Sequence, residues 1–117
     1  MKSRKKLLLL LGTLLIFSIA LNAATAVRAM DCTTTYENFG KAFMEKYCLR
    51  CHDSAKKGIA RNGAPGGVNF NDPKSISGEK AGIIKYAANK KSMPPSDPKP
   101  SDDERAKLKE WLDCEYK

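Results

Sequence analysis

Histidine is almost absent from this 117-residue chain, and cysteine is scarce. The chain has one histidine, His52, and four cysteines. A structural zinc site takes four Cys or His ligands, usually in closely spaced pairs. Only Cys48 and Cys51 form such a pair, because Cys32 and Cys114 stand alone in the sequence. This distribution disfavours a zinc site.

The sequence also contains nothing that suggests parallel β-strands. A redox dithiol of the thioredoxin type belongs to a βαβ scaffold and needs no histidine beside it. A thiol oxidoreductase that uses Cys48 and Cys51 is therefore a weak alternative. With 117 residues, the chain has room for one domain, since a second core would be too small to be stable.

Acidic residues are fewer than basic ones, 13 against 21, and the formal net charge is +8. A charge of this sign suggests nucleic acid or a membrane surface as a partner. Five of the basic residues, however, lie among the first 29, which contain no acidic residue: Lys2, Arg4, Lys5, Lys6 and Arg28. The rest of the chain carries a net charge of only +3. We therefore expect no nucleic-acid partner.

A long apolar run covers residues 7–21, after basic residues and before small ones. This order is typical of a secretory signal peptide, and Ala-x-Ala-like cleavage sites end at Ala26 and at Ala29. We expect residues 1–29 to be cleaved, which leaves residues 30–117 as an exported domain in a bacterial periplasm. A retained membrane anchor is the alternative, because the run is near the short limit for spanning a bilayer.

The 88 residues that remain form a small domain, whose thin core would profit from a covalent link or a cofactor. Disulfides persist in an exported protein. Cys32 and Cys114 lie near the two ends of this domain, so we expect a disulfide between them rather than two unpaired thiols. The bridge would close a loop of about 82 residues and stabilise the fold by roughly 4–5 kcal/mol.

The C-x-x-C pair is followed directly by the single histidine, in the stretch YCLRCHD at residues 47–53. In an exported chain, C-x-x-C-H is typical of covalent haem c attachment. The thiols of Cys48 and Cys51 then add to the two vinyl groups along one edge of the porphyrin, and His52 becomes the proximal iron ligand. The sequence therefore predicts one covalently bound haem c with its iron.

The segment KSMPP at residues 91–95 is a candidate for the second iron ligand. Its prolines enforce a stiff, extended backbone that would present Met93 at a fixed geometry. Met30 lies at the expected mature terminus, and Met44 lies in a helical pattern too close to the attachment site. We predict that Met93 binds the iron and raises its reduction potential. A gap-filling core methionine is the alternative.

Three segments have the apolar spacing of helices. Residues 33–47 and residues 77–90 carry apolar side chains at three- and four-residue intervals. The last helix begins at a capping box formed by Ser101 and Glu104. It then places three apolar side chains on one face: Leu108, Trp111 and Leu112.

With these motifs, the chain resembles a class I (mitochondrial-type) monohaem cytochrome c of the short bacterial kind. The resemblance implies an all-α cytochrome c fold, with three to four helices around one haem c and long loops rich in glycine and proline. In that family a glycine of the first helix lets it approach an aromatic residue of the last. Gly40, eight residues before Cys48, and Trp111 stand at the matching positions.

The loop after His52 is rich in glycine. The resemblance places Pro65 near the turn that supplies a backbone carbonyl to the other nitrogen of the haem-binding histidine. Val68 and Phe70 are candidates to face the haem, with ordinary core packing as the alternative. Arg61 is a candidate partner for a haem propionate, with a solvated loop arginine as the alternative.

Two features depart from the family pattern. The mid-chain tryptophan that many mitochondrial members direct at a haem propionate is missing, because Trp111 is the only tryptophan. The aromatic residue expected four positions before Cys48 is Met44. The sequence therefore does not identify the residues that contact the haem propionates or those that pack beside the attachment site.

The expected function is that of an electron carrier rather than an enzyme, because both axial positions of the iron are filled. We expect a monomer without a stable membrane span after signal cleavage. Acidic redox proteins would dock at the haem edge, near four lysines: Lys56, Lys57, Lys90 and Lys91. The main alternative is a small haem peroxidase or a gas-binding or sensor haem protein with a labile sixth ligand.

Overall fold

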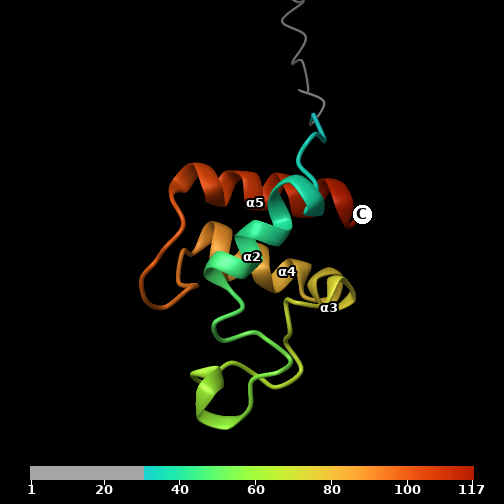
Figure 1. The fold of residues 1–117 in the computed structure, drawn as a ribbon. Helices are drawn as coiled ribbons and strands as arrows, with labels where there is room; N and C mark the ends of the chain where they lie inside the picture. The colour runs from blue at the N-terminus through green and yellow to red at the C-terminus, as the bar shows by residue number, and fades with distance from the viewer. Residues whose placement is uncertain (1–30) are drawn as a thin grey trace, which may run out of the picture.

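The computed structural model describes residues 31–117, so the predicted signal peptide lies outside the described residues. This part of the chain consists of helices joined by loops, without a strand (Figure 1). The predicted all-α class is therefore confirmed. No helix between residues 31 and 117 is long and apolar enough to cross a membrane.

The first helix begins with a wide π-type turn, η1 (Tyr36–Gly40), and continues as α2 (Lys41–Tyr47). Thr35 caps it, because its hydroxyl accepts the N–H of Asn38 while the Asn38 side chain accepts the N–H of Thr35. This reciprocal pair satisfies two amide groups that have no partner inside the helix. The helix predicted over residues 33–47 therefore begins at Tyr36 and ends where expected.

The last helix, α5 (Asp102–Glu115), begins at the predicted capping box of Ser101 and Glu104. In Figure 1, the start of the first helix, η1, crosses α5. The crossing is close, because a Cβ atom built on Gly40 would lie 2.4 Å from Cζ2 of Trp111. A real side chain cannot occupy that space, so the glycine is a requirement of this contact.

The middle of the chain differs from the prediction. The helix expected from residue 77 begins at α4 (Lys80–Ile83) and continues as η3 (Ile84–Asn89). A separate short helix, α3 (Pro73–Gly78), precedes it, in a region where a loop was expected. Asp72 caps α3 by accepting the N–H of Lys74, and Pro73 occupies the first turn. Asp followed by Pro is a helix-start signal that the apolar periodicity of so short a segment did not show.

The Cys32–Cys114 disulfide is present, with the two Cα atoms 5.5 Å apart. It joins the start of the described chain to the end of α5, which lie side by side in Figure 1. Two hydrogen bonds add to this junction, since Glu115 accepts the N–H of Tyr36 at 2.7 Å and the indole N–H of Trp111 at 2.6 Å. The predicted bridge therefore lies within a larger contact between the ends of the domain.

The core lies between α2, α4 and α5. Its largest fully buried side chains come from three helices, α2, α3 and α5: Met44, Ile76, Leu108, Trp111 and Leu112. Met44, which replaces the aromatic residue of the family pattern, is 1% exposed. It therefore fills the core, and this burial fits its exclusion as an iron ligand.

Glu104 also links α5 to α2, because its carboxylate accepts the Tyr47 hydroxyl at 2.8 Å and the Ser101 N–H at 2.8 Å. The bond from the Ser101 backbone, followed by the bond from Tyr47, lowers the pKa of Glu104 to about 2 from its usual 4.5. A lowered pKa in the folded state means that the charged carboxylate stabilises the fold. This stabilisation is complete above pH 4.5 and disappears as the pH falls towards 2.

We therefore expect Glu104→Gln to destabilise the protein at neutral pH and to make little difference near pH 2. The measurement is the free energy of unfolding in guanidinium chloride between pH 7 and pH 2.5. The difference between wild type and variant should shrink steadily below about pH 4.5. A difference that stays constant over this range would contradict the assignment.

Candidate haem site

A cavity of about 350 Å³ opens between the end of α2, the loop after His52, the α4–η3 helix and the segment after residue 90. Most of its wall is apolar. The wall includes six of the residues predicted from the sequence: Cys48, Cys51, His52, Pro65, Val68 and Phe70. Met93 also lines it, together with apolar residues of the helices and the nearby loop, among them Phe43, Ile83, Ala87, Pro94 and Pro95. The structure therefore brings the attachment motif and the predicted sixth ligand to one cavity.

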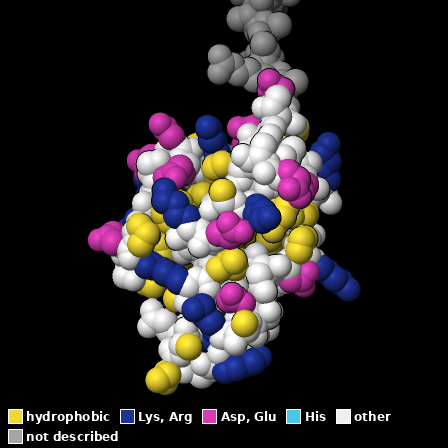
Figure 2. All heavy atoms as spheres, in the orientation of Figure 1, with side chains coloured by type: hydrophobic (Ala, Val, Ile, Leu, Met, Phe, Trp, Pro, Cys, Tyr) yellow, Lys and Arg dark blue, Asp and Glu magenta, His cyan; other side chains and the backbone are white. Residues whose placement is uncertain are grey.

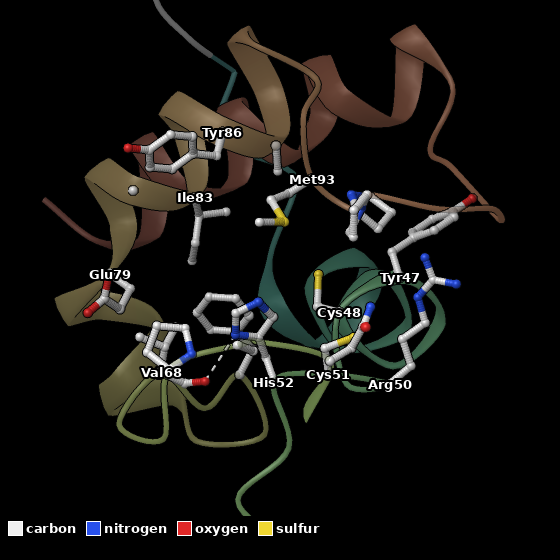
Figure 3. A pocket seen from close by; sticks show the side chains of 18 of the residues that line it. Tyr47, Cys48, Arg50, Cys51, His52, Val68, Glu79, Ile83, Tyr86 and Met93 are labelled. Carbon is white, nitrogen blue, oxygen red and sulfur yellow. Dashed lines mark hydrogen bonds between the residues drawn. The ribbon is translucent and has the colours of Figure 1, made fainter. Parts of the chain in front are cut away.

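The attachment motif forms a compact turn directly after α2. The N–H of Cys51 and the N–H of His52 both donate to the carbonyl of Cys48, at 3.1 and 2.9 Å. This winding brings both thiols and the imidazole to the same side of the backbone, where they line the cavity (Figure 3). Burial raises the pKa of the Cys48 thiol to about 12. In the absence of a haem, this sulfur is therefore a protonated thiol at neutral pH.

His52 is held in one orientation. Its Nδ1 lies 3.1 Å from the carbonyl of Val68, and its ring stacks on Phe70 with the centroids 4.6 Å apart. A carbonyl oxygen only accepts hydrogen bonds, so Nδ1 of His52 carries the proton. The lone pair of Nε2 is then free to bind a metal. Burial is the main cause that lowers the pKa of His52, which keeps the imidazole neutral as metal binding requires.

The resemblance placed Pro65 near the turn that supplies this carbonyl, and the carbonyl belongs to Val68, whose N–H donates to the Pro65 carbonyl at 3.1 Å. Pro65 lines the cavity, and its carbonyl also accepts from Arg61 at 2.6 Å. The turn that begins at Pro65 therefore brings the Val68 carbonyl to the histidine. Val68 and Phe70 both lie at the cavity wall, as expected for residues that face the haem.

Arg61 is not a solvated arginine, and it does not line the cavity. It is 5% exposed, and its guanidinium donates to backbone carbonyls from several parts of the loop, including Asp53 at 2.8 Å and Val68 at 2.9 Å. The Val68 carbonyl thus accepts from both Arg61 and His52. Arg61 therefore fixes the loop, and through Val68 it fixes the carbonyl that orients the histidine.

Met93 enters the cavity from the side opposite His52. In Figure 3 its sulfur points towards the histidine, whose free ring nitrogen points back. Its N–H donates to the carbonyl of Tyr86 at 3.1 Å. Its side chain lines the cavity and is not part of the core. The backbone, rather than side-chain packing, therefore holds Met93 in this place.

Two arginines that the sequence analysis did not single out hold the segment after Met93. Arg105 of α5 is 4% exposed and donates to the carbonyl of Met93 at 2.9 Å. Arg50, between the two motif cysteines, donates to the carbonyls of Ser96 and Asp97. Arg105 lies three residues before Leu108, on the apolar face of α5. A charged residue within that apolar row was the sign in the sequence of a buried arginine.

The donor set of the cavity fits a haem c. It offers two thiols, a neutral imidazole with a free nitrogen and a thioether on the opposite wall, within a largely apolar surface. Soft sulfur and imidazole ligands are those that haem iron takes in cytochromes. A zinc ion would find no further histidine, since His52 is the only one in the chain.

The helical fold and this cavity together define the class of monohaem c-type cytochromes. Comparison with known families identifies the family within this class. The chain belongs to the family described as "Cytochrome C oxidase, cbb3-type, subunit III", whose model matches residues 38–112, more than half of the chain. Its cofactor is therefore a covalently bound haem c with iron. No curated protein and no solved structure gave a significant match.

Proposed function

We propose that the protein is an exported electron carrier whose haem c is attached to Cys48 and Cys51 and ligated by His52 and Met93. The observation that carries the proposal is the placement of His52 and Met93 on opposite walls of one cavity, with the free ring nitrogen and the sulfur facing each other. Residues 1–29 serve as the cleaved signal peptide, and the mature protein works in the periplasm. Haem-based electron transfer is the function that its family suggests.

The residues around the cavity suit electron transfer. When bound, the haem iron supplies a one-electron couple, and a methionine ligand raises its potential. The bond from His52 Nδ1 to Val68 strengthens the histidine as a ligand and fixes its ring. Phe70, Ile83 and Ala87 are buried beside the cavity and exclude water from its inner wall. With both axial positions filled, a substrate has no direct access to the iron.

One observation favours the second candidate, a small peroxidase or gas-binding haem protein. Met93 comes from the loop after η3 rather than from a helix, and its backbone is held by hydrogen bonds to Tyr86 and Arg105. A ligand presented from a loop can leave the iron more easily than one fixed on a helix. The two functions differ in whether Met93 stays bound to the iron.

The thiol oxidoreductase has little support. The attacking cysteine of a redox dithiol has a lowered pKa, because the thiolate is the nucleophile. Burial shifts the pKa of Cys48 in the opposite direction, to about 12. Cys48 is therefore not the activated thiol that disulfide exchange needs.

The test is the visible spectrum of the mature protein, produced in a periplasm with haem-attachment machinery. We expect a c-type pyridine haemochrome, a low-spin spectrum and, in the oxidised protein, the band near the red edge that reports Fe–S(Met) ligation. A high-spin spectrum would favour the peroxidase or gas-binding alternative. After denaturation, only the disulfide cysteines should yield thiols for alkylation, and only after reduction. Labelling of Cys48 and Cys51 would reject covalent attachment.

We further propose that acidic redox proteins dock beside the cavity mouth. Four lysines were predicted to surround this edge, but none of them lines the cavity: Lys56, Lys57, Lys90 and Lys91. Lys90 lies 5.7 Å from the ring centre of Tyr86, an exposed residue of the cavity wall, and Lys85 lies 5.0 Å from it. Lys91 is paired with Asp102 at 2.7 Å. Lys85 and Lys90 are therefore the better candidates for attracting a partner.

Figure 2 shows basic and acidic side chains interspersed over the face that it draws. We propose that Lys85 and Lys90 attract the partner locally. We expect Lys85→Gln/Lys90→Gln to slow electron transfer to an acidic redox partner and to reduce the dependence of the rate on ionic strength. The rate is measured by stopped flow from low to high salt. Lys107→Gln, an exposed position on α5, is the control. An equal effect of both variants would contradict this docking site.

A further inference from the structure

We propose that Arg105 is the positioning residue for the sixth ligand: by holding the carbonyl of Met93, it keeps the methionine sulfur facing His52 and so sets how readily another ligand displaces it. The inference rests on the proposed His52 and Met93 ligation. It assigns to α5 a role at the cavity that its sequence pattern does not reveal.

Arg105 is placed for this role. It is 4% exposed, and its guanidinium reaches three carbonyls: those of Ala87, Met93 and Pro100. Ala87 belongs to η3, whereas Met93 and Pro100 belong to the segment between η3 and α5. One side chain therefore joins the helix that lines the cavity, the ligand residue and the start of α5.

Met93 depends on such backbone contacts. Its N–H is bound to Tyr86 and its carbonyl to Arg105, at 3.1 and 2.9 Å. Pro94, which follows, is buried. The Met93 side chain lines the cavity and is not part of the core. Loss of the hydrogen bond from Arg105 removes one of the two backbone contacts of Met93 and leaves the methionine side chain unchanged.

The geometry requires arginine at this position. The Nε–H of Arg105 donates to Pro100 at 3.2 Å, while Nη1 donates towards Ala87 and Met93. The planar guanidinium has donors in several fixed directions, whereas a lysine ammonium is a single compact charge. Lysine keeps the charge but cannot make all three contacts. The Arg105→Lys variant therefore separates the effect of geometry from that of charge.

The experiment measures imidazole binding to the oxidised haem protein, since imidazole binds the iron only when Met93 leaves. We expect Arg105→Gln to bind imidazole at least about tenfold more tightly than wild type, which corresponds to about 1.4 kcal/mol in the Met93-bound state. Its Fe–S(Met) band should weaken and its reduction potential should fall. The imidazole affinity of Arg105→Lys should lie between those of wild type and Arg105→Gln. If Arg105→Gln does not fold, the affinity of Arg105→Lys is the test of the proposal.

Two controls separate positioning from general stability. Lys107→Gln removes a positive charge from an exposed position of α5. Leu108→Ala weakens the core at a fully buried position one turn further along. We expect Leu108→Ala to lower the free energy of unfolding while imidazole affinity stays within about twofold of wild type, a difference well below 1.4 kcal/mol.

The outcomes distinguish the two proposals. A wild-type protein without the Fe–S(Met) band would overturn the proposed ligation, and the role of Arg105 with it. A wild-type protein with the band, and an Arg105 variant with unchanged imidazole affinity, would overturn the role of Arg105 alone. A tenfold rise in the imidazole affinity of Leu108→Ala would also overturn the role of Arg105, because the effect would then result from reduced stability alone.

Discussion

Replacement of Met93 by alanine is expected to open the iron to external ligands. The Fe–S(Met) band should disappear completely, the reduction potential should fall, and the reduced protein should bind carbon monoxide, which the wild type should not. The reason is geometric: Met93 is the residue whose sulfur faces the free nitrogen of His52 across the cavity. Alanine has no donor atom and is too short to fill that space.

Visible spectra of the oxidised, reduced and carbon monoxide-treated variant provide the measurement. Met44→Leu is the matched control, because Met44 is a buried methionine of similar size that packs in the core. It should keep the band and exclude carbon monoxide. An unchanged spectrum in Met93→Ala, with no binding of carbon monoxide, would remove Met93 from the site.

Gly40→Ala is expected to give the largest loss of stability among the small substitutions considered. The added Cβ atom would lie 2.4, 2.6 and 2.7 Å from three atoms of the Trp111 ring. Trp111 is fully buried and is also held through its indole N–H by Glu115 at 2.6 Å. The ring therefore cannot move away without disturbing the core.

Overpacking of this kind costs about 1–3 kcal/mol or more, which exceeds the roughly 0.5–1 kcal/mol that alanine gains over glycine in a helix. The measurement is the free energy of unfolding of the haem protein in guanidinium chloride. Gly78→Ala is the control, because a Cβ atom there meets nothing within 4 Å. A stable Gly40→Ala variant would show that η1 and α5 can separate slightly at little cost.

Some features of the site follow from short stretches of sequence. The turn CLRCH places two thiols and an imidazole together because their spacing is local, and the structure keeps them together. The capping box of Ser101 and Glu104 is likewise contained within four residues. The close approach of Gly40 to Trp111 was expected only through the family resemblance, because the sequence between them does not show which helices cross.

Other features were missed or misplaced because they depend on the path of loops. The carbonyl that orients His52 belongs to Val68, three residues beyond Pro65, and Arg61 donates its hydrogen bonds to the loop. Both assignments required the backbone direction of a glycine-rich segment, and glycine leaves that direction open. The short helix α3 was missed because six residues carry too little periodicity.

The sequence by itself determined the haem attachment motif, the helical class and the cysteine pair of the disulfide, because each depends on residue type, local spacing or a chain too small to be stable without a covalent link. Only the tertiary structure decided which carbonyl meets His52 and which side chain holds Met93. Arg105 is twelve residues from Met93, and one side chain meets the backbone of another segment only when both have been packed. Contacts of this kind are properties of the fold, and no local pattern encodes them.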